Sequence, residues 1–285
     1  MKKILERILI FFIGIPAVAA LVLFLPFYNN LIMNIFVIAF SAIGAFEFSK
    51  MLENRQLKIN RAEAVILGSS VPLAATLTAS FNLPEWLFPF IFVTGAGWVL
   101  LSGVFTRAEK MEIVLSRITA GFSVMMYPGF FMCWVVKMTI WENSPAILVF
   151  LLIVFGSDSM AWLFGNLFGS KNRGIIAASP NKSIAGFIGG IIGTVIVAGG
   201  AALIVPDVFI SRLNLSAVLA AVLLGICTGI AATLGDLAES AIKRSCGFKD
   251  SGNIILGRGG ILDSIDSIAA AAPVYFLLFN IFFAG

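Results

Sequence analysis

Long, unbroken apolar runs are the feature that most restricts how this chain can fold. Each run holds about 20 residues with almost no charge, which is the length of helix that crosses a hydrocarbon core about 30 Å thick. Within lipid every backbone N–H and C=O must be paired inside the protein, so only helices and closed barrels can cross it. Because the runs are continuous and do not alternate between apolar and polar residues, they predict helices.

Composition supports the same interpretation. Of the 285 residues, 60% are hydrophobic and only 12% are Asp, Glu, Lys or Arg, whereas soluble domains carry about 25% charged residues. So few charged residues would not cover a water-facing surface. We therefore predict an all-α, polytopic integral membrane protein with about nine transmembrane helices. The expected spans are 8–26, 31–48, 63–81, 87–105, 118–138, 145–168, 184–205, 216–235 and 266–284.

Basic residues are concentrated on one side of this nine-span arrangement. That side holds 17 of the 19 Lys and Arg residues, and only Lys137 and Arg212 fall on the other. Cytoplasmic loops carry the Lys/Arg excess, so the pattern predicts a multi-pass protein of the inner (plasma) membrane with a cytoplasmic N-terminus and an external C-terminus. The connecting segments expected in the cytoplasm are 49–62, 106–117, 169–183 and 244–265.

Cysteine and histidine usage excludes several kinds of chemistry. The chain has no histidine, which excludes histidine acid–base catalysis and histidine metal ligands. Cys133, Cys227 and Cys246 are odd in number and widely spaced, which argues against a disulfide framework or a zinc site. No small-residue cleavage site follows the first apolar run, so we expect a retained helix there and not a signal peptide.

The two halves of the chain differ in their polar residues. Residues 1–140 read as a scaffold of N-terminal transmembrane helices, and residues 141–285 read as the half that carries the chemistry. In the first half Glu47 is the exception, near the end of an apolar run. We expect it at the membrane interface or paired with Lys50, three residues further on, in preference to a functional role.

Polar residues interrupt the apolar pattern early in the second half. Asp158 lies inside an apolar run, and because an unpaired carboxylate in lipid is costly, it should face the bundle interior and a partner. The segment Ser179–Ser183, which includes Lys182, follows and opens a glycine-containing run. A serine before a helix is most simply an N-cap, but a Lys beside the free amides of a helix start also suits a phosphate. The residues leave both readings open.

The densest polar cluster follows the eighth expected span. Its first five members recur at i, i+3, i+4, i+7 and i+8, which places them on one helical face: Asp236, Glu239, Ser240, Lys243 and Arg244. A salt-bridged helix leaving the membrane is the simplest explanation. However, a glycine-containing loop with Lys249 and Asp250 follows, and then Asp263 and Asp266. Carboxylates beside basic residues and glycines suit a divalent metal and a polyphosphate.

The stretch from Ser240 to Asp266 resembles the signature of the phosphatidate cytidylyltransferases, also called CDP-diacylglycerol synthases. That pattern runs roughly S-x-x-K-R-x-x-x-x-K-D-x-G, then P-x-H-G-G-x-x-D-R-x-D. The matching positions are Ser240, Lys243, Arg244, Lys249, Asp250, Gly252, Gly259, Gly260, Asp263 and Asp266. Upstream, Asp158–Ala161 and Ser179–Ser183 resemble two further family segments, so the resemblance extends from about residue 150 to the end.

Four positions depart from the family pattern. Leu256 replaces a proline, Arg258 replaces the signature histidine, and Ser264 replaces an arginine. Ala185 stands where the family usually has a glutamate. These changes imply altered substrate handling or lost activity, unless Arg258 supplies the positive charge missing at position 264.

The resemblance implies an enzyme of phospholipid biosynthesis that converts CTP and phosphatidate to CDP-diacylglycerol and pyrophosphate. It implies one or two Mg²⁺ ions held by Asp236 and Asp263, which are catalytic together with Lys243, Arg244 and Asp266. The expected partners are CTP and membrane phosphatidate, with a homodimer left open and no nucleic acid. The residues expected to bind substrate are Asp158, Ser179, Lys182, Ser183, Ser240, Lys249, Asp250 and Arg258.

Two alternative functions stay open at this point. The four departures favour a divergent or inactive relative of the same family. An ion-coupled transporter would use Asp158 and Asp236 as intramembrane carboxylates. Transporters usually place such sites near the membrane midplane between repeats, whereas here most acids and bases gather at one interface and no repeat is evident.

Overall fold

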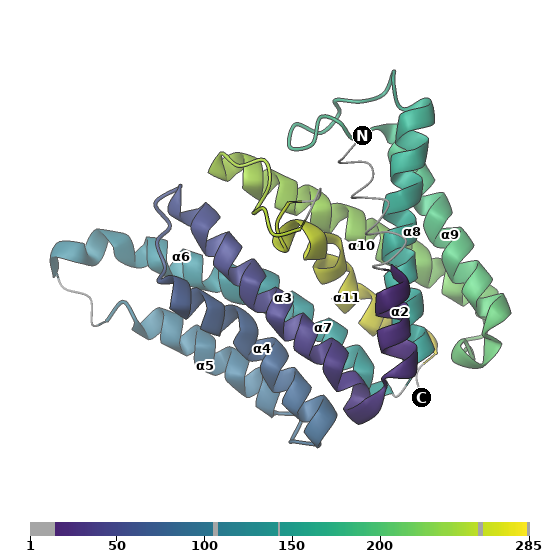
Figure 1. Ribbon diagram of the computed structural model, residues 1–285, viewed down its shortest axis with the longest axis horizontal. Helices are drawn as coiled ribbons and strands as arrows, with labels where there is room; N and C mark the ends of the chain where they lie inside the picture. Colours follow the sequence, from purple (N-terminus) through teal and green to yellow (C-terminus); the bar gives the residue numbers. More distant parts are fainter. Residues whose placement is uncertain (1–14, 105–107, 142, 256–258, 284–285) are drawn as a thin grey trace. The chain divides into compact units, whose positions relative to one another are not determined.

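The computed structural model describes residues 15–104, 108–141, 143–255 and 259–283 (Figure 1). Throughout these ranges the chain forms helices joined by short connections. The β-type pairing among them is confined to two isolated bridges, Arg173 with Ser183 and Ile255 with Gly259. The all-α prediction is confirmed.

Seven helical segments of the described residues are long and apolar enough to cross a membrane. They are α3 (Phe27–Glu53), α4 (Arg61–Phe81), the segment Met111–Trp141, α8 (Ser144–Phe168), α9 (Ile184–Ile204), α10 (Ala217–Cys246) and α11 (Leu262–Phe282). The segment Met111–Trp141 contains α6 (Val114–Val124), a π-helical turn η3 (Met125–Phe130) and α7 (Phe131–Met138). Two further apolar helices are shorter, α2 (Ile15–Phe24) and α5 (Leu87–Leu101).

The expected number of nine spans is not confirmed. Part of the first expected span, 8–26, lies outside the described residues, and α5 has only 15 residues. The last two helices also differ in their limits, because α10 continues past residue 235 to Cys246 and α11 already begins at Leu262. The added turns carry charged residues, so an apolar run marks the membrane-embedded part of a helix and not its end.

Helix α10 ends in a defined motif at Gly247, whose φ of +80° is accessible to glycine at little cost. The Gly247 N–H donates to the Arg244 carbonyl at 3.1 Å, and the Phe248 N–H donates to the Lys243 carbonyl at 2.9 Å. This is the Schellman arrangement that satisfies the last carbonyls of a helix. Asn54 Nδ2 adds a third donor, to the Cys246 carbonyl at 2.6 Å.

The chain forms two compact units. The first comprises Met1–Ile140 and Lys243–Ile265, and the second comprises Trp141–Ile242 and Asp266–Gly285. Helices α10 and α11 each contribute residues to both units. The loop that carries half of the matching signature positions, residues 247–261, therefore belongs to the same unit as the N-terminal helices.

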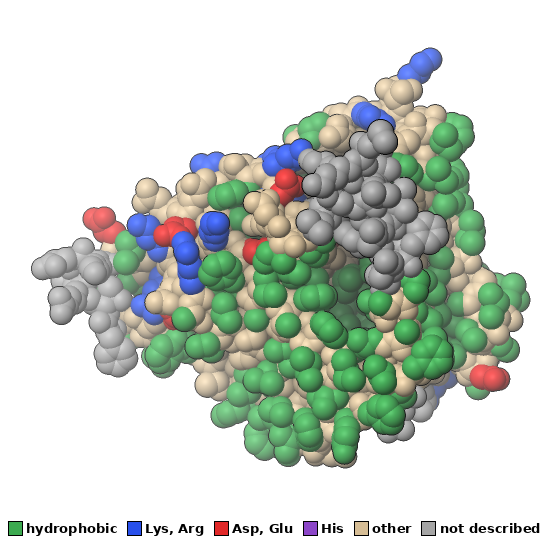
Figure 2. All heavy atoms as spheres, viewed as in Figure 1, with side chains coloured by type: hydrophobic (Ala, Val, Ile, Leu, Met, Phe, Trp, Pro, Cys, Tyr) green, Lys and Arg blue, Asp and Glu red, His purple; other side chains and the backbone are tan. Residues whose placement is uncertain are grey.

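In the first unit α3 packs against α4, and α4 packs against α5 and η3 (Figure 1). Leu67, Val99 and Met125 form a buried apolar cluster among these helices. On the visible face of this unit, charged side chains gather near the connection between α3 and α4, and hydrophobic side chains cover much of the rest (Figure 2). The unit thus has a polar end and an apolar flank, as a membrane-embedded bundle requires.

In the second unit α8 and α9 pack closely through glycines of α9. A Cβ atom added at Gly189 would meet the Phe164 side chain at 2.5 Å, and one at Gly193 would meet the Gly156 carbonyl at 2.7 Å. These two glycines are four residues apart, the small-xxx-small spacing that brings membrane helices together. Ser183 begins α9, since its hydroxyl accepts the Gly186 N–H at 3.1 Å.

Replacing Gly193 by alanine should separate α8 from α9. The new methyl would overlap the Gly156 carbonyl and the Met160 side chain, and overpacking of this kind costs about 1–3 kcal/mol. Gly200→Ala on the same helix is the matched control, because nothing lies within 4 Å of its Cβ position. Thermal unfolding in detergent should show a lower Tm for Gly193→Ala and an unchanged or higher Tm for Gly200→Ala. Equal shifts would contradict this packing.

Candidate functional site

Two groups of interacting charged and polar residues, one within each unit, contain most of the candidate site residues. The first, here called the loop cluster, surrounds the start of α11 and comprises Glu47, Lys243, Ser251, Gly260 and Asp263. The second, here called the acidic cluster, comprises Asp158, Lys182, Asp236, Glu239, Ser240 and Asp266.

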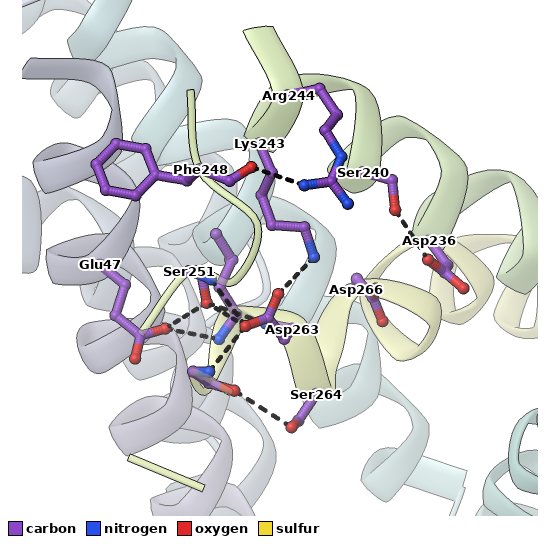
Figure 3. Close-up of polar contacts among 12 residues, drawn as sticks. Glu47, Asp236, Ser240, Lys243, Arg244, Phe248, Ser251, Asp263, Ser264 and Asp266 are labelled. Atoms are coloured by element: carbon purple, nitrogen blue, oxygen red, sulfur yellow. Dashed lines mark hydrogen bonds and ion pairs between the residues drawn. The ribbon is translucent and has the colours of Figure 1, made fainter. Parts of the chain in front are cut away.

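An ion pair lies at the centre of the loop cluster. Lys243 Nζ is 2.5 Å from Asp263 Oδ1, and the two side chains are only 10% and 6% exposed (Figure 3). Lys243 comes from the last turns of α10, and Asp263 from the first turn of α11. A desolvated pair of this kind is held in one geometry, unlike the mobile ion pairs of a protein surface.

The second oxygen of Asp263 organises the loop between the two helices. Asp263 Oδ2 accepts the backbone N–H groups of Ser251 and Gly260, both at 2.8 Å, and lies 3.0 Å from Ser251 Oγ. A carboxylate provides about four acceptor positions. Lys243 and the two backbone N–H groups use three of them when the Ser251 hydroxyl donates to Glu47 instead, and one acceptor position of Asp263 is then left for a further partner.

The Ser251 hydroxyl stands between two carboxylates. Its oxygen is 3.0 Å from Asp263 Oδ2 and also 3.0 Å from Glu47 Oε2 (Figure 3). A hydroxyl has one proton to donate, so it serves one carboxylate at a time. The Asp263 N–H in turn lies 3.3 Å from the Ser251 oxygen.

Glu47 was the least expected member of this group. Its side chain is buried, and its oxygens accept the N–H groups of Ile261 at 3.1 Å and Leu262 at 2.9 Å. The expected pairing with Lys50 is therefore wrong, because the partners of Glu47 belong to a distant segment of the chain. No ion pair joins Glu47 to Lys50 in the part of the chain that the structure describes. An acidic residue inside an apolar run was the only sequence signal that could have found it.

The acidic cluster contains a second Lys–Asp pair. Lys182 Nζ lies 2.7 Å from Asp236 Oδ2, and Ser240 Oγ donates to Asp236 Oδ1 at 3.3 Å. Asp236 is thus oriented through both of its oxygens, and it is one-third exposed. The i, i+4 spacing expected for Asp236 and Ser240 on one helical face is confirmed.

Three more carboxylates belong to the acidic cluster in the same unit. Asp266 is buried, and the charges of Asp236, Glu239 and Asp158 all act on it. Its Oδ1 accepts the Ser267 N–H at 2.6 Å. Gathering like charges in a poorly solvated place is unfavourable unless cations compensate them, and Lys182 supplies one such cation at Asp236.

A tight turn before α9 supplies the lysine of the acidic cluster. The Lys182 N–H donates to the Ser179 carbonyl at 3.1 Å, and the Gly174 N–H donates to the Pro180 carbonyl at 3.0 Å. Of the two readings of Ser183, the structure shows the helix cap. Lys182 is directed to Asp236, so this segment presents a positive charge at the edge of the cluster.

The remaining candidate residues lie outside these contacts. Arg244, Lys249 and Asp250 are exposed, and Arg244 donates to the Phe248 carbonyl at 3.1 Å (Figure 3). Arg258 and Leu256 lie outside the described residues. Of the other two departures from the family pattern, Ser264 donates to the Gly260 carbonyl at 3.3 Å, and the Ala185 N–H faces Asn172 Oδ1 at 3.5 Å.

The described oxygen ligands of the two clusters are of the kind that a hard divalent ion prefers, but they are not arranged around a common metal position. Carboxylate oxygens such as those of Asp236 and Asp263 are the ligands that Mg²⁺ prefers. Within the described ranges, no group of three or more His, Cys, Asp or Glu side chains is arranged to hold a metal ion. Lysines occupy positions beside both aspartates, Lys182 on Asp236 and Lys243 on Asp263.

Comparison with known proteins identifies the family. The cytidylyltransferase family matches residues 5–282, so the chain belongs to it. It is 31% identical over 202 residues to a phosphatidate cytidylyltransferase of Thermotoga maritima, covering 70% of this chain and 72% of the relative. A phosphatidate cytidylyltransferase of Haemophilus influenzae is 29% identical over 95% of this chain and 96% of its own length. One from Staphylococcus haemolyticus is 43% identical over 134 residues.

Removing the cation of the loop cluster should lower the free energy of unfolding far more than removing a cation from the surface. Lys243→Met leaves the Asp263 carboxylate without its 2.5 Å partner, and breaking a buried pair costs about 3–5 kcal/mol. The control is Arg61→Met, because the Arg61–Glu53 pair is 54% and 52% exposed, and such pairs contribute about 1 kcal/mol or less. Chemical denaturation of the two variants should show this difference. Equal stability would contradict the buried pair.

Proposed function

We propose that this chain is a phosphatidate cytidylyltransferase that converts CTP and phosphatidate to CDP-diacylglycerol and pyrophosphate. The observation that supports this most directly is the pairing of the two aspartates expected to bind metal with lysines, Lys182–Asp236 and Lys243–Asp263, in a chain that belongs to the cytidylyltransferase family along nearly its whole length. Relatives that carry this name match from 46% to 95% of the chain.

The reaction is a substitution at phosphorus. An oxygen of the lipid phosphate attacks the α-phosphorus of CTP, a new P–O bond forms, and the bond to the β-phosphate oxygen breaks, so that pyrophosphate leaves. No covalent enzyme intermediate is needed, and catalysis then consists of holding the two substrates in line and stabilising charge. The absence of histidine from the chain is compatible with this chemistry.

Cationic side chains would stabilise the phosphates. Lys182 and Lys243 are already oriented by aspartates, which reduces the reorganisation needed when charge develops. Arg244 and Lys249 are exposed on the last turn of α10 and the loop after it, where an incoming nucleotide could reach them. Ser240 has the supporting role of orienting Asp236 through its hydroxyl, and the Asp236 charge acts on the neighbouring Asp266.

One or two Mg²⁺ ions are part of the proposal, with Asp236 and Asp263 each supplying a carboxylate ligand. When bound, Mg²⁺ neutralises phosphate charge and supports a leaving pyrophosphate. Asp236 carries one lysine and one serine contact, and Asp263 retains an acceptor position. Their donor chemistry therefore suits the ion.

Arg258 limits what the signature position can do. Arginine stays protonated at any working pH, so it cannot act as a general base. An active enzyme with arginine there needs only positive charge or hydrogen-bond donation at this position. An assay of the parent protein distinguishes such an active enzyme from a divergent or inactive relative of the family.

Activity measurements test the proposal directly. Purified protein with labelled CTP, phosphatidate and Mg²⁺ should form labelled CDP-diacylglycerol, and omission of Mg²⁺ should abolish it. Asp236→Asn and Asp263→Asn should each lower kcat by about 100-fold or more, because a charged ligand is lost at nearly constant volume. Asp207→Asn, at an exposed position in η5 (Pro206–Val208), should retain parental activity. An inactive parent in several lipids and metals would favour the inactive relative.

We also propose that the polar end of the bundle faces the cytoplasm, where CTP is available. Contacts within the first unit support a common side for three of the basic connecting segments. Ser116 Oγ donates to the Gln56 carbonyl at 2.5 Å, Arg55 contacts the Ser245 carbonyl, and Arg117 pairs with Glu63 at 3.0 Å. The positive-inside rule then gives the direction, and the plasma membrane remains the expected location.

Cysteine labelling in intact cells checks this orientation. On a background without the three native cysteines, Asn253→Cys should react with an impermeant thiol reagent only after the membrane is opened. Asn214→Cys, in the connection between α9 and α10, should react from outside. Both positions are exposed, whereas Ser251 in the same loop as Asn253 is buried and would react poorly on either side. The reverse labelling pattern would overturn the assignment.

A further inference from the structure

Glu47 holds the signature loop from a helix that lies about 200 residues earlier in the chain. Three donors converge on its carboxylate: the Ile261 N–H on Oε1 at 3.1 Å, and the Leu262 N–H and Ser251 Oγ on Oε2 at 2.9 and 3.0 Å (Figure 3). All three belong to the segment that precedes Asp263. Glu47 itself lies in α3 and is only 4% exposed.

Two of these donors are the free amides of a helix start. The first N–H groups of α11 have no carbonyl partner within the helix, and the helix dipole makes this end attractive to a negative charge. Glu47 of α3 provides both the acceptor for these N–H groups and the negative charge, and among the described residues no side chain of the loop is used for this. Charge-assisted bonds of this kind are roughly twice as strong as neutral ones, so they hold the backbone on which Asp263 is mounted.

The third donor connects Glu47 to Asp263 through a side chain. Ser251 Oγ lies within hydrogen-bond distance of both carboxylates, and the Ser251 N–H donates to Asp263 Oδ2 at 2.8 Å. Glu47 therefore acts on Asp263 by two routes, through the backbone immediately before it and through Ser251. Lys243, paired with the other oxygen of Asp263, completes the arrangement.

Two signature glycines pack directly against the Glu47 carboxylate. A Cβ atom at Gly252 would overlap Glu47 Oε1, and one at Gly260 would overlap Glu47 Oε2 and Ser251 Oγ. Both glycines have ordinary negative φ values, since neither is among the positive-φ positions. Close approach of the loop to Glu47, and not an unusual backbone conformation, is therefore what requires glycine at these two places.

From these contacts we infer that Glu47 is a positioning residue for the reaction: it sets the place of Asp263 by fixing the start of α11 and the Ser251 hydroxyl. The inference rests on the proposed cytidylyl transfer. Glu47 acts through Asp263 and Ser251, so its loss should displace a catalytic carboxylate and leave substrate-binding groups elsewhere in place. Misplacement by about 1 Å can lower a rate about 100-fold.

Two substitutions and one matched control separate positioning from general stability. Glu47→Gln preserves the volume and one carbonyl acceptor, and Glu47→Ala removes every acceptor. Glu53→Ala is the control, because Glu53 lies on the same helix but is exposed and paired with Arg61 at 3.2 Å. For each full-length protein, kcat and KM for both substrates are measured together with thermal stability and the hydrogen exchange of loop 251–262.

We expect kcat to fall about 10-fold in Glu47→Gln and about 100-fold in Glu47→Ala, with KM for phosphatidate within about threefold of the parent. The Ile261 and Leu262 amides should exchange faster in both variants, and Glu53→Ala should match the parent in every measurement. Parental kcat in Glu47→Ala would overturn the inference while leaving the proposed function intact. So would a loss of activity that only follows the loss of folded protein, with parental exchange in Glu47→Gln. An inactive parent would instead overturn the proposed function and the inference with it.

Discussion

Burial of two carboxylates in the first unit determines the shape of the loop between α10 and α11. A buried charge is costly unless it is paired and fully hydrogen-bonded, and Glu47 and Asp263 meet that requirement with the same short segment. Its backbone N–H groups at 251, 260, 261 and 262 all point to one of the two carboxylates. Lys243 provides the positive charge for Asp263. The glycines and the early start of α11 follow from this requirement.

The second unit also contains carboxylates in a poorly solvated place, and there a lysine from a turn provides the compensating charge. The charges of Asp158, Asp236 and Glu239 all act on Asp266 there, and a lysine on the turn before α9 approaches Asp236. Glycines allow α8, which carries Asp158, to pack closely against α9, which follows the turn that carries Lys182. Both clusters thus pair an aspartate expected to bind metal with a lysine, which is suited to a reaction whose substrates carry many negative charges.

Much of the fold and part of the site could be predicted from the sequence. Apolar runs located the long helices because lipid requires internally paired backbone, and the 3.6-residue period placed Asp236 and Ser240 on one face. The exact helix ends could not be predicted, since α10 continues through charged turns that hydropathy excludes. Glu47 was misread because local spacing offers Lys50 as its partner, whereas its actual partners are 204 to 215 residues away.

The origin of those partners also affects how far the signature can be treated as a transferable module. Its loop donates three hydrogen bonds to Glu47 of α3, and two of its glycines leave the space that the Glu47 carboxylate occupies. A chimera that takes the C-terminal half from one relative and the N-terminal helices from another would keep its loop conformation only if the incoming α3 carries a carboxylate at the matching position. The site is therefore built from two distant segments, and an exchange of one of them preserves it only where the incoming segment still matches the other.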